Sequence, residues 1–454
     1  MFPRTATLVA TLCGVQLAIA TSTVPPFGHD LRPYFYFDDN FTQYNHGEFE
    51  GPVLNICMSC CHPVFSQSDR IHSPRCRAGA YGGTPRPVLE AQFGYMQIME
   101  RDIDPFMNGD NGYRACIASA RATLGALINA NTSNLDDLVL VDNASEAINA
   151  IIRNMEPPLS ADEYILDLST AYGPFVGLYT WLGSREGVKT ITVPIQWPVT
   201  GPESFIDPVR ATLEANASTL NIRVAVISQI TAYPAVIVPV RALCNLFHAH
   251  GIPVIVDGAH ALGNIAVDLQ SMGDPDYAFW NIHKWYFGPK SAALMYVRRD
   301  HQLLHVPAPA VVDSPETQPF IERFIWTGTR DRTAYCAIQA ATDFRAALGG
   351  EAAVQKYNSD LALSAAHYLT ELWGVAPMAP DSMYAGSALV NVQIPTQNST
   401  ACGVLRSRLR DLGLGMSGWT AISGPPAITC YFRISGMVRL FAQMPSSSVC
   451  YCTT

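Results

Sequence analysis

The sequence predicts an α/β protein with a mostly parallel sheet flanked by helices, followed by a smaller α+β region. Two observations lead to this fold class. From about Leu135 onward, short apolar runs typical of buried strands alternate with segments whose apolar residues recur at helical spacing. Alternation of this kind is typical of βαβ units, whose strands pair in parallel. The chain also shows no internal repeat and no low-complexity run, which argues against a solenoid or a tail-like protein.

The individual elements follow from these patterns. Apolar residues at Ile148, Ile151, Ile152 and Met155 predict a helix that stops before the two prolines at 157–158. A second helix is expected over 240–250, ended by a glycine, and a long helical stretch over 335–347 leads into the smaller region, which ends near residue 435. The expected strands are 137–141, 164–168, 224–230, 252–256, 277–282 and 292–297.

Composition limits the function classes. The 454 residues are 48% hydrophobic and carry a formal net charge of −9, whereas a nucleic-acid binder or a basic membrane-surface protein normally has the opposite balance. No internal run reaches the roughly 18 apolar residues of a membrane span. Lysine occurs only four times, at Lys189, Lys284, Lys290 and Lys356, so chemistry that needs an amine has few candidates.

Both ends of the chain carry unusual segments. Residues 1–20 have one basic residue and an apolar stretch that closes with Ala-Ile-Ala, which predicts a secretory signal peptide; an ordinary apolar segment or a misplaced start remains an alternative. Residues 48–78 have no hydrophobic period, and joining Gly47 to Ala80 gives a smooth Asn-His-Gly-Ala-Tyr-Gly-Gly-Thr-Pro loop. We interpret 48–78 as an insertion translated from an unspliced intron, and we expect the tail 436–454 to be atypical as well.

Of the 12 cysteines, Cys57, Cys60, Cys61 and Cys76 crowd into the insertion. With His62 they could form a zinc knuckle, although the spacing lacks a second clean pair, so a secreted metal-binding module is an alternative reading. The five in the body are expected to be free thiols, because an odd number spread over a large domain does not suit a disulfide framework. They are Cys116, Cys244, Cys336, Cys402 and Cys430.

Three groups of polar residues follow predicted strands. Residues 142–146, Asp-Asn-Ala-Ser-Glu, open a helix whose N-terminal N–H groups suit a phosphate, although Asn and Ser there also serve as plain caps. Asp257 ends an all-apolar strand, where a partly desolvated carboxylate needs a cationic partner, and His260 lies three residues later. Lys284 comes just after the next strand beside His283, where loss of water lowers its pKa and makes it a candidate for Schiff-base chemistry.

Since ligands gather at the carboxyl ends of parallel strands, these three groups are expected on one rim. An anion cradle, a buried carboxylate and a reactive lysine are what pyridoxal 5′-phosphate (PLP) requires. The aldehyde bonds to the lysine, the phosphate lies at the helix N-terminus, and the carboxylate keeps the ring nitrogen protonated.

The stretches Asp-Gly-Ala-His-Ala-Leu-Gly at 257–263 and Asn-x-His-Lys-Trp at 281–285 with Pro-Lys at 289–290 resemble the class V aminotransferase family of fold-type I PLP enzymes. More narrowly, the chain resembles the isopenicillin N epimerase-like, cysteine desulfhydrase-like and hercynylcysteine sulfoxide lyase-like branch. The resemblance implies a PLP-dependent transferase fold of type I with a seven-stranded-type sheet. It also implies an N-terminal segment 27–110 with the insertion, a large PLP-binding domain 111–332 and a small C-terminal domain 333–454.

The resemblance further implies a role for each matching position. Lys284 would form the Schiff base and move the proton at Cα, Asp257 would pair with the ring nitrogen, and His260 would bind the 3′-oxygen. The expected phosphate ligands are Ala144, Ser145, Asn281 and His283, with Thr329 reaching the site of the neighbouring subunit of a homodimer. Tyr172 would contact the ring, although Thr170 stands where many relatives have a histidine. Arg433, Asn45 and His46 would bind the substrate.

These groups serve several reactions of an amino-acid substrate. The stretches 140–149 and 283–285 favour a carbon–sulfur lyase or cysteine desulfhydrase, with an epimerase or a biosynthetic aminotransferase as alternatives. An inactive chain from a misread gene is the alternative of another class. The compartment stays open as well, because the leader indicates secretion, whereas PLP supply and free thiols indicate the cytosol.

Overall fold

The structure is a computed structural model of the chain, and it describes residues 82–130, 135–304 and 319–395 with a few short pieces elsewhere. The predicted leader, the insertion and its cysteines, and the tail after residue 435 lie outside the described residues. Within the described part, no helix is both long and apolar enough to cross a membrane. The short pieces are 31, 34–35, 42–43, 414–415, 421–422 and 429–435.

A seven-stranded sheet forms the centre of the molecule, with strand order β2-β8-β7-β6-β5-β3-β4. The strands from β4 to β7 pair in parallel, and β8 runs antiparallel to both of its neighbours. This confirms the predicted α/β class with its mostly parallel sheet. The strands are β2 (Leu138–Val141), β3 (Glu163–Leu168), β4 (Lys189–Val193), β5 (Asn221–Ser228), β6 (Val254–Asp257), β7 (Tyr277–Asn281) and β8 (Ala293–Val297).

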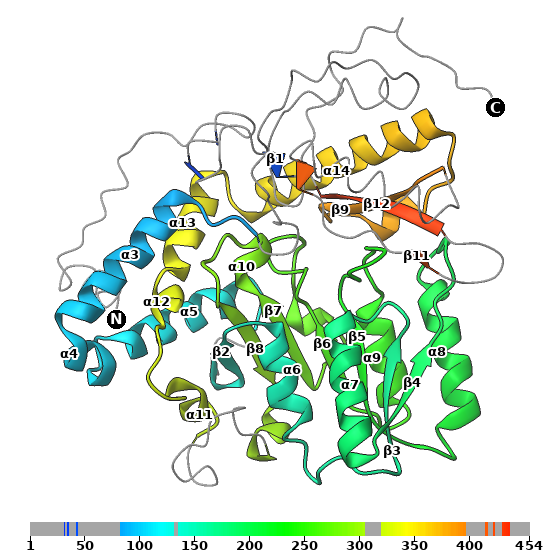
Figure 1. The fold of residues 1–454 in the computed structure, drawn as a ribbon, viewed down its shortest axis with the longest axis horizontal. Coiled ribbons are helices and arrows are strands. Elements are labelled where there is room, and N and C mark those ends of the chain that lie inside the picture. The colour runs from blue at the N-terminus through cyan, green and yellow to red at the C-terminus, as the bar shows by residue number, and fades with distance from the viewer. Residues whose placement is uncertain are drawn as a thin grey trace, which may run out of the picture.

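Helices cover both faces of this sheet, so its central strands are buried on each side (Figure 1). Along β3, Ile165 and Leu166 belong to different hydrophobic clusters because successive side chains point to opposite faces. One cluster includes residues of α6 (Ala144–Ile152) and α7 (Gly173–Glu186). The other includes residues of α3 (Arg86–Arg101), α4 (Ile103–Asn108), α5 (Tyr113–Leu127), α8 (Glu203–Asn216) and α9 (Val240–His248).

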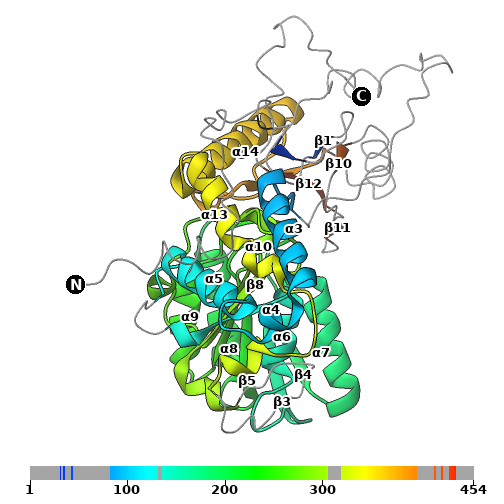
Figure 2. The same ribbon diagram turned by 90° about the vertical axis from the view of Figure 1, so that its left-hand side faces the viewer.

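A second, antiparallel sheet has the order β11-β12-β9 and packs with α14, while β1 pairs with β10 elsewhere. Figures 1 and 2 both show α10 between the seven-stranded sheet on one side and α14 with β12 on the other. The carboxyl end of β7 therefore faces this second region. The elements are α10 (Ile282–Trp285), α11 (Glu322–Ile325), α12 (Thr333–Cys336), α13 (Ile338–Ala347), α14 (Glu351–Trp373), β9 (Leu389–Gln393), β11 (Ala421–Ile422), β12 (Thr429–Ser435), β1 (Thr42–Gln43) and β10 (Leu414–Gly415).

Three local predictions need correction. The helix expected over 335–347 is two helices, α12 and α13, separated at Ala337, which has ψ 0° instead of a helical value. The helix expected to include Met155 ends at Ile152. The expectation of free body thiols is wrong for Cys116 and Cys336, which form a disulfide between α5 and α12. Cys244 is free, as expected, and it is buried.

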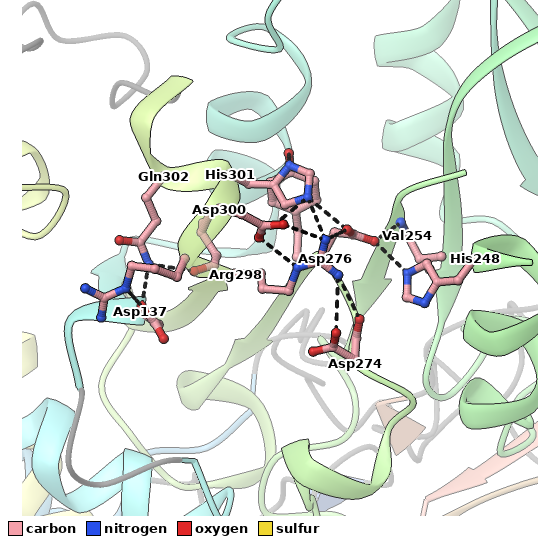
Figure 3. A network of polar contacts seen from close by, with 12 residues as sticks. Asp137, His248, Val254, Asp274, Asp276, Arg298, Asp300, His301 and Gln302 are labelled. Atoms are coloured by element: carbon pink, nitrogen blue, oxygen red, sulfur yellow. Dashed lines mark hydrogen bonds and ion pairs between the residues drawn. The ribbon is translucent and has the colours of Figure 1, made fainter. Parts of the chain in front are cut away.

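A cluster of charged residues closes the amino-terminal edge of the sheet, where β6 and β7 begin (Figure 3). Its centre is Asp276, which is 2% exposed. Its carboxylate accepts hydrogen bonds from His248 Nε2 at 2.9 Å, the Val254 amide at 2.7 Å and His301 Nε2 at 2.9 Å, and pairs with Arg298 at 2.8 Å. These partners, above all the two histidines, hold the pKa of Asp276 below its usual value despite burial.

Candidate active site

The predicted catalytic residues lie where β6 and β7 end. The two strands are parallel neighbours, with Asp257 opposite Phe279 in the register. The chain leaves β6 at Asp257 and turns through His260, whereas it leaves β7 at Asn281 and forms the short helix α10 that carries Lys284. Parallel pairing of consecutive strands thus brings two segments, separated by more than twenty residues, to one edge.

Lys284 and His260 are in contact at this edge. Lys284 Nζ lies 3.3 Å from His260 Nε2, and the other ring nitrogen of His260, Nδ1, accepts a hydrogen bond from the Trp285 indole at 3.4 Å. His260 and Trp285 are buried, and Lys284 is half-buried. The structure therefore brings His260 and Lys284, which were predicted from two separate motifs, into contact.

Asp257 is the buried carboxyl group of the site, 7% exposed. Burial raises its pKa to about 6, against the lowering effects of the Ala259 amide and of the charge of Lys284. The Ala259 amide donates to Oδ1 at 2.9 Å, and among the described residues this is the hydrogen bond that the carboxylate accepts. The second oxygen is thus left for a further donor, which a protonated ring nitrogen can supply.

The predicted phosphate loop begins α6. Asn143 caps the helix, its side chain accepting the Glu146 amide at 2.9 Å. The Ala144 amide donates to Asn281 Oδ1 at 2.9 Å, so the end of β7 is tied to the start of α6. Ser145 follows Ala144 in the first turn of this nine-residue helix, where the helix dipole favours an anion. Four of the residues proposed for PLP, Ala144, Ser145, Asn281 and Lys284, therefore border one edge.

His283 adjoins the same edge, half-buried, with Nδ1 2.9 Å from the Ala292 carbonyl oxygen. Since a carbonyl only accepts, Nδ1 carries a proton. Burial lowers the pKa of His283 to about 4, with a further lowering by the charges of Lys284 and Lys290. His283 is therefore neutral at pH 7 in this state, and an approaching phosphate would favour its protonation.

A loop from the N-terminal segment packs on the turn that carries Lys284. Gly82 has φ +64°, and a Cβ there would lie 2.3 Å from the His283 carbonyl oxygen and 2.5 Å from that of Lys284. Close approach at this point requires glycine. Two residues later, the Thr84 hydroxyl donates to the Gly288 carbonyl at 3.1 Å and accepts from Lys290 Nζ at 3.2 Å. The segment just after the predicted insertion thus supports the turn that carries Lys284.

Tyr172 and Thr329 are placed less directly. Tyr172 precedes α7 and is 38% exposed, with its ring edge-on to Phe175 at 5.5 Å. Thr329 is exposed on a loop whose next residue, Arg330, pairs with Asp142 and Glu146 at the start of α6. The roles of Tyr172 and Thr329 stay predictions.

The side chains of the three predicted substrate-binding residues are not among those that the structure describes. Asn45 and His46 lie outside the described residues. The backbone of Arg433 is described in β12, opposite Asn391 of β9, but its side chain is not. The predicted carboxylate-binding role of Arg433 therefore remains a proposal.

Four residues at or near this edge were not predicted from the sequence to contribute to the site. Trp285 contacts His260, and Arg345 donates to the Trp285 and Gly263 carbonyls at 2.8 and 2.9 Å. Asp167 of β3 is 1% exposed, and its Oδ1 has no partner among the described residues. Burial raises its pKa to about 6. Tyr179 of α7 is also buried, and Asp167 and Asp257 both help to raise its pKa. A lone Asp in the apolar run 164–168 was a visible signal for the first of these carboxylates.

Comparison with known proteins supports the family. The chain matches the model of the aminotransferase class-V family over residues 110–408. It is 30% identical to an L-cysteine desulfhydrase of Arabidopsis thaliana over 326 residues, which cover 70% of each chain. It is 24% identical to a hercynylcysteine sulfoxide lyase of Schizosaccharomyces pombe, covering 62% of this chain and 70% of that one.

Solved structures agree on the fold. The complex of the cystine C–S lyase C-DES with cysteine persulfide superimposes with a TM-score of 0.59 at 16% identity, covering 80% of this chain and 93% of that one. At this identity the likeness concerns the fold alone, and it confirms the expected fold type. The family match extends over most of the described strands and helices. The chain belongs to the class V aminotransferase family, in the branch that the sequence motifs indicated.

Proposed function

We propose that the protein is a PLP-dependent carbon–sulfur lyase that acts on cysteine or a cysteine conjugate and releases its sulfur. The observation that carries the proposal is the meeting of Lys284, His260 and Asp257 at the carboxyl edge of β6 and β7. The relatives named for desulfhydrase and sulfoxide lyase activities point to the same chemistry, and PLP as cofactor accords with the PLP named for a structural neighbour.

The residues present fit PLP. The Asp257 oxygen without a donor among the described residues suits a protonated pyridine nitrogen, the start of α6 suits a phosphate, and the Lys284 amine suits the aldehyde. When bound, PLP supplies an electron sink for the electron pair left on the substrate Cα.

The chain's own groups then divide the work. Lys284 would bind the cofactor through its aldehyde and would take the proton from the substrate Cα. Asp257 would keep the ring nitrogen protonated, and His260 would bind the 3′-oxygen. Ala144, Ser145, Asn281, His283 and Thr329 would hold the phosphate, Tyr172 would contact the ring, and Arg433 with Asn45 and His46 would bind the substrate. We also propose a homodimer in which Thr329 reaches the neighbouring site.

Purified protein incubated with PLP should show the visible absorption band of the lysine-bound cofactor. It should release sulfide, pyruvate and ammonia from cysteine, and a sulfenate, pyruvate and ammonia from a cysteine sulfoxide, but should release none of these sulfur products from plain amino acids. Lys284→Ala should lose the band and reduce the rate by about 10²–10⁴-fold. Lys356→Ala, on the exposed side of α14, is the matched control and should leave both unchanged.

Equal behaviour of the two lysine variants would exclude the assignment of Lys284. Racemised or transaminated product without sulfide would instead favour the epimerase or the aminotransferase. A protein that neither takes up PLP nor turns over any of these substrates would favour the inactive chain.

A further inference from the structure

The residue after the catalytic lysine has a defined polar contact of its own. Trp285 is 5% exposed, and its indole N–H donates to His260 Nδ1 at 3.4 Å, while His260 Nε2 lies 3.3 Å from Lys284 Nζ. We propose that Trp285 is a positioning residue that fixes the proton of His260 on Nε2 and thereby keeps the Lys284 amine uncharged. The inference rests on the proposed function only for the role of the Lys284 amine as the group that reacts with PLP.

The direction of the chain of contacts follows from hydrogen-bond chemistry. An indole nitrogen donates and cannot accept, so His260 Nδ1 must be without a proton. The neutral ring then carries its proton on Nε2, which points it at Lys284 Nζ. An uncharged amine can accept that hydrogen bond through its lone pair, whereas an ammonium has none. The contact therefore favours the nucleophilic form of Lys284.

Without the indole, the ring would be free to exchange tautomers. A proton on Nδ1 would leave Nε2 as an acceptor, and that arrangement stabilises a lysine ammonium. Trp285 thus selects between two states of His260 that have opposite effects on the same amine.

The other ionisable groups around Lys284 act separately from this selection. The negative charge of Asp257 on β6 favours the ammonium. His283, on the same short helix, is neutral near pH 7, because burial lowers its pKa to about 4; Lys290, which also acts on His283, adds positive charge nearby. The Trp285–His260 contact therefore works against Asp257.

Packing holds Trp285 in place independently of its indole hydrogen bond. Its carbonyl oxygen accepts from Arg345 at 2.8 Å. Gly263, with φ +80°, approaches so closely that a Cβ there would lie 2.7 Å from the Trp285 carbonyl carbon. A Trp285→Phe variant should thus keep the aromatic packing and lose only the donor.

The scarcity of lysine makes a direct measurement possible. Trace acetylation of the PLP-free full-length chain over a pH series, read by peptide mass spectrometry, reports the ionisation midpoint of each of the four lysines. In Trp285→Phe, the Lys284 midpoint should rise by about one pH unit, which is about tenfold lower reactivity near neutral pH. Lys189 and Lys356 serve as internal references that should not change.

Two further variants separate the proposed contact from general damage. Trp280→Phe is the matched control, because its buried indole donates to Gln229 at 3.0 Å and not to His260, so the Lys284 midpoint should stay as in wild type. His260→Ala, which removes both ring nitrogens, should raise the midpoint, and adding Trp285→Phe to it should change nothing more.

An unshifted Lys284 midpoint in Trp285→Phe would overturn the inference, and so would a shift that persists in the His260→Ala background. These labelling results are distinct from a failure of the proposed function, which would show as a wild-type protein that does not bind PLP through Lys284. If Trp285→Phe does not fold, His260→Ala alone still decides, since an unchanged midpoint there contradicts the role of His260.

Discussion

Arg345 joins the two segments of the active site, and replacing it with methionine should destabilise the protein strongly. The guanidinium is 1% exposed and lies between the turn after Lys284 and the turn after Asp257. It donates to the carbonyl oxygens of Trp285 at 2.8 Å and Gly263 at 2.9 Å, pairs with Glu351, and lies over the ring of Tyr286 at 5.2 Å.

The size of the effect follows from these partners. Each buried carbonyl that loses its donor costs about 1–3 kcal/mol, so the two together cost about 2–6 kcal/mol. Glu351 is 27% exposed and regains water, which limits its share. A methionine keeps part of the apolar contact with Tyr286. We therefore expect Arg345→Met to lower the free energy of unfolding by about 4 kcal/mol.

Urea unfolding followed by circular dichroism measures this loss, and retention of PLP during dialysis should fall with it because the turn of Lys284 loses its support. Lys356→Met is the control, since Lys356 and Asp360 form an exposed pair at 2.7 Å on α14, and it should change the stability by less than about 1 kcal/mol. If Arg345→Met stayed within about 1 kcal/mol of wild type, the two carbonyl contacts would not be stabilising, and the reasoning would be wrong.

Three other predictions concern buried groups away from the reacting atoms. Asp167→Asn should stabilise the protein by up to about 3 kcal/mol above pH 6 and should have no such effect below about pH 4. The reason is that the pKa of Asp167 is raised to about 6, so the wild type loses stability as the pH rises from about 4 to about 6. Unfolding curves that show the same stabilisation at every pH would contradict this prediction. Asp276→Asn should cost about 3–5 kcal/mol, because His248, His301 and Arg298 lose their buried carboxylate, although Arg298 keeps its pairs with the exposed Asp274 and Asp300. The stabilisation by the Asp276 carboxylate is present above the ordinary carboxyl pKa and disappears on acidification, because the pKa of Asp276 is lowered in the folded state. Plots of unfolding free energy against pH that stay parallel for wild type and variant down to low pH would rule out this prediction. Cys116→Ser should lower the free energy of unfolding by up to about 5 kcal/mol, because it removes a disulfide between residues separated by 220 positions in the sequence. Peptide mapping of unreduced protein that finds both cysteines alkylated would show that the disulfide is not formed and would contradict this prediction.

The core of the site could be predicted because its signal is local. The apolar runs before Asp257 and Asn281 predict buried strands, and these two polar residues indicate where each strand ends. Right-handed parallel connections bring the ends of consecutive strands to one rim, so His260 and Lys284 were expected there without any knowledge of their contact. The 3.3 Å approach of the two side chains confirms this juxtaposition, while their catalytic roles stay predictions.

What the sequence could not predict depends on contacts between distant residues. Ala337 interrupts a helical pattern without glycine or proline, next to Cys336, which is bonded across 220 residues to Cys116. The local sequence has no signal for either feature, since a helix break at alanine reflects tertiary packing. Arg345 likewise looks like an ordinary helical arginine, and only the fold reveals that its partners are carbonyls of the two turns that carry His260 and Lys284.

The two edges of the sheet treat buried carboxylates in opposite ways. At the amino edge, Asp276 has two histidines, an arginine and a backbone amide as partners, and its pKa is lowered (Figure 3). At the carboxyl edge, burial raises the pKa of Asp257 and Asp167, and the described residues provide no partner for Asp167 Oδ1. A chain selected for stability alone would pair these groups as it pairs Asp276. At the carboxyl edge, donors from the described part of the chain leave carboxylate oxygens of Asp257 and Asp167 unsaturated, which is the arrangement expected where a cationic ring is to be bound.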